Sequence, residues 1–115
     1  MSLPIAGGKK TPTRSSTHRA IEFSRLAGLE QFAVRTRNTL YELTVLSPAT
    51  GEVLVRGGQF FPEHTRALFT GSSLGGSFLK VRTIHPGFLM EFHHEGRRIV
   101  TTRVKDVVAV AARSA

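Results

Sequence analysis

The sequence contains no cysteine, no tryptophan and only one tyrosine, Tyr41, among its 115 residues. The absence of cysteine excludes disulfide bonds, thiolate metal ligands and a cysteine nucleophile. No apolar run approaches the length of about 20 residues that a membrane-spanning helix needs. Acidic residues are also scarce, with eight Asp and Glu against sixteen Lys and Arg. The net charge of +8 favours anionic partners such as nucleic acid.

The positive charge is concentrated at the start of the chain. Residues 1–19 contain four basic residues and no acidic residue, whereas residues 20–115 contain twelve basic and eight acidic residues. Because the first segment is rich in Gly, Pro, Ser, Thr and Lys without helical periodicity, we predict a disordered basic tail over residues 1–19. The segment has the pattern of neither a secretory signal nor a lipidation motif, so we expect a cytoplasmic protein without membrane insertion.

The remaining residues predict one domain, since 40% of the sequence is hydrophobic. Residues 20–30 predict a short helix or an irregular lead-in, because their apolar residues are nearly at helical spacing but Gly28 interrupts them. Residues 31–112 predict a β domain, in which turn clusters separate segments of β-prone residues. The expected segments are 32–46, 52–56, 59–61, 66–70, 78–84, 88–93 and 98–104, and residues 106–112 predict either a last strand or a short helix. This spacing favours an all-β fold, either a small antiparallel barrel or a compact sandwich.

The alternation of apolar and polar residues assigns the two faces of the later strands. The residues expected in the core are Phe88, Met90, Phe92, Val100 and Val104. The residues expected on the outer faces are Lys80, Arg82, Glu91, His93 and Arg103. The pair Gly57 and Gly58 predicts a bulge or a sharp bend of a barrel strand.

Sequence motifs for nucleotide hydrolysis are incomplete. Gly71 and Gly76 have the spacing of a Walker A loop, but Ser77 stands where that loop requires lysine. This excludes a nucleotide triphosphatase of that type. Residues 71–77 remain either a plain connection or a segment that offers backbone N–H groups to an anion.

No motif indicates a catalytic or metal site. The five histidines match no spaced metal motif, and the nearest approach to a cluster is His85, Glu91 and His93. A serine-nucleophile elbow is also absent. Glu91 and Glu95 are close in the sequence, as two catalytic carboxylates would be, but neighbouring arginines make ordinary ion pairs the better interpretation. We therefore expect no enzyme, no cofactor and no resident metal, and we keep a metal or small-ligand site as a third hypothesis.

The leading hypothesis is non-catalytic binding of a polyanion, most plausibly nucleic acid, because small barrels bind single strands with basic grooves and aromatic platforms. Tyr41 is the expected stacking residue. The residues expected to contact phosphates are Arg35, Arg37, Lys80, Arg82, Arg97, Arg98 and Arg103. The second hypothesis is a protein-interaction or assembly module, either a homo-oligomer or a partner adaptor, that uses exposed strand edges.

The size of the domain and its basic β pattern are similar to those of PilZ domains, which bind cyclic dinucleotides. Two departures limit the resemblance. Arg14 and Arg19 have one residue too many between them for the family's R-x-x-x-R pair, and Asn38 is not followed by the family's second motif. The resemblance therefore implies only a fold-level analogy and a cyclic-dinucleotide-like ligand as part of the third hypothesis.

A second resemblance covers residues 33–108. The strings 36–42, 57–58, 71–77 and 87–92 resemble small bacterial β-rich proteins of uncharacterised function. This resemblance implies a β-rich fold and a bacterial cytoplasmic origin. It implies no activity and no site residues.

Overall fold

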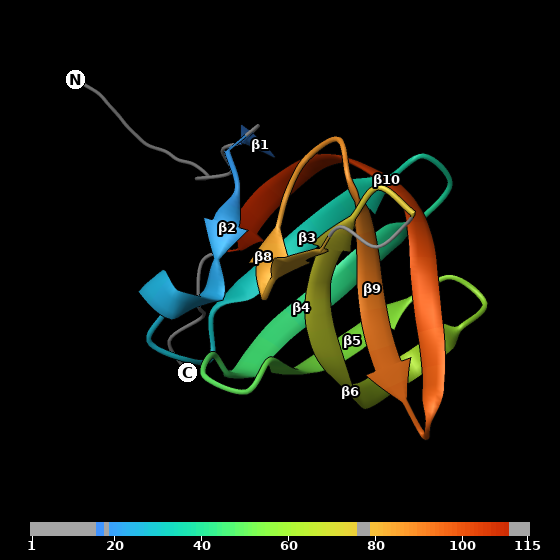
Figure 1. Cartoon of the computed structure of the whole chain (residues 1–115), viewed down its shortest axis with the longest axis horizontal. Coiled ribbons are helices and arrows are strands. Elements are labelled where there is room, and N and C mark those ends of the chain that lie inside the picture. Colours follow the sequence, from blue (N-terminus) through green and yellow to red (C-terminus); the bar gives the residue numbers. More distant parts are fainter. Residues whose placement is uncertain (1–15, 18, 76–78, 111–115) are drawn as a thin grey trace.

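The computed structural model describes residues 16–17, 19–75 and 79–110, and almost all of them belong to β-strands or to the turns between strands (Figure 1). The elements are β1 (Ser16–Thr17), β2 (Ile21–Glu22), η1 (Phe23–Arg25), β3 (Gln31–Thr36), β4 (Leu40–Ser47), β5 (Glu52–Gly57), β6 (Phe61–Ser73), β7 (Leu79–Val81), β8 (Thr83–Ile84), β9 (Leu89–His94) and β10 (Arg97–Val110). The all-β prediction is confirmed. No helix in the described ranges is long and apolar enough to cross a membrane.

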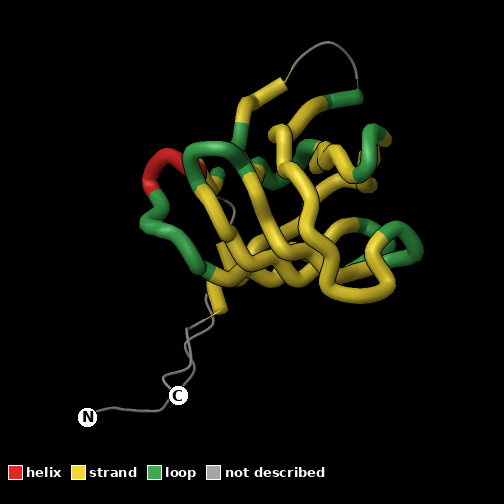
Figure 2. Tube along the Cα trace, turned by 90° about the horizontal axis from the view of Figure 1, so that it is seen from below, coloured by secondary structure: helices red, strands yellow, loops and turns green. Residues whose placement is uncertain are grey.

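The strand pairs form an antiparallel ring, which makes the fold a small barrel (Figure 2). Around the ring the order is β3, β4, β5, β6, β9 and β10, and β10 also pairs with β3. In the ring, each of the long strands β6 and β10 pairs with one neighbour along its first part and with another along its second part. For example, β10 pairs with β9 over residues 97–103 and with β3 over residues 104–110. Short strands β1 and β7 add to β10 and β6, and β2 pairs with β8.

Phenylalanine rings fill the interior of the barrel. Phe23 packs against Phe69, with ring centroids 5.1 Å apart. Phe92 contacts both Phe69 and Phe61, at 5.4 Å each. All four side chains are fully buried. Since Phe23 comes from η1, this short turn covers one end of the core, and each ring pair stabilises the fold by about 0.5–1.5 kcal/mol beyond its burial.

β10 changes which of its residues face the core as it bends around the barrel. Its pairing register shifts between Val100 and Arg103 and again between Val104 and Asp106. The buried residues are consequently Ile99 and Thr101, then Val104, then Val107. The core prediction is confirmed for Met90, Phe92 and Val104. It is wrong for Val100, which is only half-buried because simple alternation does not continue through a bulge.

Phe88 was also expected in the core but is half-buried, because it lies in the turn before β9 rather than on that strand. The segment 32–46 was expected to be one strand, yet a turn at residues 37–39 divides it into β3 and β4. Thr36 stabilises this turn, since its backbone N–H donates to the Thr39 carbonyl at 2.8 Å.

The predicted irregularity at Gly57 is present, because the register with β6 shifts there. Gly57 has a φ of 150°, and a side chain at this position would meet the Leu40 carbonyl oxygen. Residues 58–60 then form the turn into β6. Of the two short strands expected at 59–61 and 66–70, the first is mostly this turn, and β6 runs without a break from Phe61 through the second. That strand continues through residues 71–73, so the first part of the expected loop 71–77 is buried sheet; residues 76–78 lie outside the described residues.

Near the start of the chain, Ser16 and Thr17 pair with Val108 and Val107, so these two residues extend the sheet instead of belonging to a disordered tail. The prediction for residues 1–15 lies outside the described residues. Residues 20–30, expected to form a short helix or an irregular lead-in, contain β2 and the three-residue 3-10 turn η1.

We predict that Thr101→Val lowers the free energy of unfolding by about 1–3 kcal/mol, because a buried donor loses its acceptor. At the first bulge, the Met90 N–H donates to Thr101 Oγ1 at 3.0 Å, in place of a strand-to-strand bond. Urea unfolding measures the effect. Thr101→Ser keeps the hydroxyl and serves as the control; equal stabilities of the two variants would contradict this role.

Candidate functional site

Several arginines of the described structure are paired with acidic side chains. Arg56 lies 2.7 Å from Glu42, and Arg25 lies 3.6 Å from Glu22. Arg35 pairs with Asp106 across β3 and β10. The Arg35 guanidinium, expected to contact phosphates, is therefore already engaged by a carboxylate.

Glu91 forms the most buried of these ion pairs. Its side chain accepts hydrogen bonds from Arg98 Nε and Nη2, both at 3.0 Å, and from the Ser73 hydroxyl. The hydrogen bonds from Arg98 hold the pKa of Glu91 below its ordinary value, although burial opposes them. Glu91 was expected on the outer face, but it is only 6% exposed. Arg98, expected at the phosphates, instead neutralises this buried carboxylate.

Three cationic residues of the described structure have no acidic partner and line one cavity: Arg37, Arg103 and Lys105. The cavity measures about 400 Å³, and Leu89, Thr101 and Thr102 form the rest of its lining. The backbone brings the cations together, because the Arg37 N–H donates to the Arg103 carbonyl at 3.1 Å. Arg103 is further oriented by a hydrogen bond from its Nη1 to the Gly87 carbonyl, at 2.7 Å.

A second cavity of about 220 Å³ lies next to the first, and Thr101 and Thr102 line both. Phe60 lines this second cavity and is 50% exposed, which leaves part of its ring in contact with solvent. Asn38 and Gln59 bring side-chain amides to the same cavity. We call the two cavities together the bulge groove.

The bulge groove exists because β10 lacks a neighbour along part of one edge. β3 pairs with β10 only from Val104 onward, and no other described strand lies along that edge of residues 97–102. The turns that join β3 to β4 and β5 to β6 lie at the same end of the barrel, on the right of Figure 1. They supply Asn38 and Phe60, and the bulges turn Arg103 and Lys105 outward.

The structure divides the expected nucleic-acid residues among several places. Arg37 and Arg103 meet in the bulge groove, whereas Arg82 lines a cavity at the other end of the barrel. Lys80 belongs to β7, and Arg97 begins β10 beside the β9–β10 turn. Tyr41, expected to stack on bases, also lines the second cavity, but it is only 4% exposed and leaves Phe60 as the exposed ring there. Burial also raises the pKa of the Tyr41 hydroxyl.

The metal site considered for His85, Glu91 and His93 is not formed. Within the described ranges, no three His, Asp or Glu side chains gather closely enough to hold a metal ion. Glu91 is occupied by Arg98 and Ser73. The His85 ring lies against Phe88 instead, with ring centroids 4.3 Å apart.

Sequence reasoning missed Phe60 because most phenylalanines of a small domain belong to its core. The signal was its position directly after Gly57, Gly58 and Gln59. If those residues are interpreted as a hairpin turn, Phe60 belongs to the turn and cannot reach the core. Lys105 shares a face with Arg103 by simple alternation, but that both residues point outward depends on the register shift between Val100 and Arg103, which the sequence does not reveal.

We predict that the Glu91 ion pair makes stability depend on pH. Because the folded pKa is lowered, the stabilisation is fully present above the ordinary value of 4.5 and is lost as pH falls through the lower folded pKa. Glu91→Gln should therefore be less stable than the unmodified chain at neutral pH, with a difference that shrinks in acid. Unfolding measured against pH tests this, with Glu63→Gln, at an exposed position on β6, as the control. A difference that stays constant down to acid pH would contradict the role.

In comparisons with protein-family models, curated proteins and solved structures, the chain gave no significant match.

Proposed function

We propose that this chain is a non-catalytic binding protein that holds single-stranded nucleic acid in the bulge groove. The observation that carries the proposal is the convergence of Arg37, Arg103 and Lys105 on one cavity without an acidic partner among the described residues. Arg35 and Arg98 nearby are paired with carboxylates, and no acidic side chain lines the groove, so its three cations are available to an anion.

Phosphate binding follows from the chemistry of these side chains. Arginine presents several N–H donors in a planar fork that matches phosphate oxygens, and lysine adds a point charge. Arg103 uses one nitrogen, Nη1, for the Gly87 carbonyl and keeps the other donors. Neutralised phosphates release counterions, which makes the binding depend steeply on salt.

The second half of the groove is suited to a base. The exposed ring of Phe60 offers a stacking surface, which every base can use through its π-face. Amide groups such as those of Asn38 and Gln59 can donate to and accept from a base edge. Because a base in a duplex is stacked and paired, it cannot reach this ring, and we infer a preference for single strands.

The types of residue in the groove also favour binding over catalysis. Neither of its cavities is lined by a histidine or a carboxylate, the side chains that most often transfer protons in enzymes. Its lining consists of cations, amides, hydroxyl groups, one exposed ring and apolar side chains. Such a set holds a ligand through charge, hydrogen bonds and stacking.

The second hypothesis, an assembly module, has one observation in its favour. β7 is an edge strand, and Leu79 and Val81 are exposed on it. A symmetric pairing of two copies centred on this strand would place Lys80 opposite Lys80 of the second copy, and like charges directly opposite each other destabilise strand pairs. We therefore rank assembly below nucleic-acid binding. A cyclic-dinucleotide-like ligand, from the third hypothesis, would use the same phosphate and base contacts and would compete with a single strand.

We predict that Arg37→Gln/Arg103→Gln/Lys105→Gln weakens binding of labelled oligothymidylate and oligouridylate and lowers the log–log salt slope by about 2. Fluorescence anisotropy across a salt series, with duplex DNA in parallel, measures both. The matched control is Arg66→Gln/Arg82→Gln/Arg97→Gln, which removes the same charge from three exposed arginines that also form no described ion pair and lie outside the groove. Equal weakening by both triple variants would show that only net charge matters and would overturn the site.

We predict that Phe60→Ala weakens single-strand binding by about 1–3 kcal/mol per stacked base and leaves the salt slope unchanged. The same anisotropy assay measures this effect. Phe60→Tyr, which keeps an aromatic ring, should retain the affinity. If Phe60→Ala binds as tightly as the unmodified chain, the base-binding half of the proposal is wrong.

A further inference from the structure

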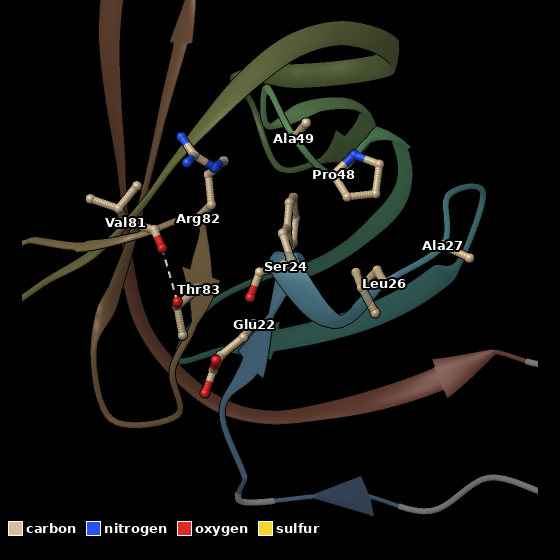
Figure 3. Close-up of a pocket in the computed structure, with 10 residues that line it drawn as sticks. Glu22, Ser24, Leu26, Ala27, Pro48, Ala49, Val81, Arg82 and Thr83 are labelled. Atoms are coloured by element: carbon tan, nitrogen blue, oxygen red, sulfur yellow. Dashed lines mark hydrogen bonds between the residues drawn. The ribbon is translucent and has the colours of Figure 1, made fainter.

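A cavity of about 630 Å³ lies at the end of the barrel opposite the bulge groove, beside η1, β2 and β8 (Figures 1 and 3). Its walls come from η1, from the turn between β4 and β5, and from the junction of β7 and β8. The lining is partly apolar, with Leu26, Ala27, Pro48 and Ala49 around it and Val81 at 55% exposure. Its volume falls within the range of roughly 300–1,000 Å³ typical of small-molecule sites.

Arg82 lines this cavity with a backbone conformation that is rare for a residue with a side chain. Its φ is 45°, in the left-handed region. Two backbone hydrogen bonds hold it there: the Arg82 N–H donates to the Thr70 carbonyl at 2.9 Å, and the Phe23 N–H donates to the Arg82 carbonyl at 3.0 Å. Glycine would adopt this conformation without strain, so an arginine at this position suggests a role for its side chain.

The neighbours of Arg82 leave its charge available. Its aliphatic stem lies against Gly51, where an added Cβ would be 3.4 Å from both Cγ and Cδ of Arg82. No described acidic side chain forms an ion pair with Arg82. Glu22 lines the same cavity, but it pairs with Arg25 at 3.6 Å and lies across the cavity from the Arg82 guanidinium in Figure 3.

We propose that this cavity binds a small amphiphilic carboxylate, with the carboxylate on the Arg82 guanidinium and the apolar part against Leu26, Pro48 and Ala49. A guanidinium holds a carboxylate through two parallel N–H donors, and the apolar lining excludes water from the rest of the ligand. The site shares no lining residue with the bulge groove, so it stands independently of nucleic-acid binding.

The test is isothermal titration of the full chain with octanoate, and with octanol, octylamine and acetate as comparison ligands. Octanoate should bind about tenfold or more tightly than octanol, which has the tail without the charge, and than acetate, which has the charge without the tail. Octylamine, with the opposite charge, should not bind measurably.

Arg82→Gly is the decisive variant, because glycine accepts the backbone conformation and removes only the side chain. It should melt at the same temperature as the unmodified chain or higher, and it should bind octanoate about tenfold or more weakly. Arg66→Gln removes an exposed arginine on β6 that lies outside the cavity lining and forms no described ion pair, and it should bind normally. Equal octanoate affinity of Arg82→Gly and the unmodified chain, equal binding of octanol and octanoate, or no octanoate binding at all would overturn the proposal.

Discussion

The bending of β10 is the constraint on which the rest of this structure depends. One strand pairs first with β9 and then with β3, and the two register shifts along it allow the ring to close. Each bulge also exchanges the inward-facing and outward-facing positions along the strand, so that Thr101, Val104 and Val107 face the core in turn. The same bend leaves residues 97–102 without a neighbour on one edge, and this is where the bulge groove lies. Barrel closure and the candidate binding surface therefore have the same structural cause.

The charges are arranged around this geometry. Glu91 and Arg98 form an ion pair on the β9–β10 hairpin, and Asp106 neutralises Arg35 just beyond the second bulge. Between these two pairs, Arg103 and Lys105 have no acidic partner in the described structure, and Arg37 joins them from the end of β3. Because the arginines on both sides are neutralised by carboxylates, these three cations form a positively charged surface between the two ion pairs. In this account the ion pairs define the limits of the site, and the unpaired cations form it.

The sequence predicted the fold class, strands near residues 88–93 and 98–104, and three of the five residues expected in the core, because turn residues and period-two alternation are local signals. It did not predict the groove, because the groove depends on where β10 changes register and on which strands meet it. Val100 illustrates the difference: alternation back from Val104 places it inward, but the register shift between Val100 and Arg103 intervenes, and Ile99 and Thr101 are the buried residues on that side of the shift. Tyr41 and Glu91 were misplaced for a similar reason. The alternation of residues along a strand reveals neither the turn at residues 37–39 nor the contact between Glu91 and Arg98. Arg37 and Arg103 are both among the expected phosphate contacts, but only the folded barrel shows that they line one cavity.

The most direct test of the account is an amide chemical-shift titration of the isotopically labelled chain with oligothymidylate. The account predicts that the shifts concentrate on Arg37, Asn38, Gln59, Phe60 and residues 101–105, and that Arg82 and η1 at the other end of the barrel stay unchanged. Shifts spread over all basic residues, or centred on β7 or the β9–β10 turn, would contradict the claim that the bulges of β10 create the binding site.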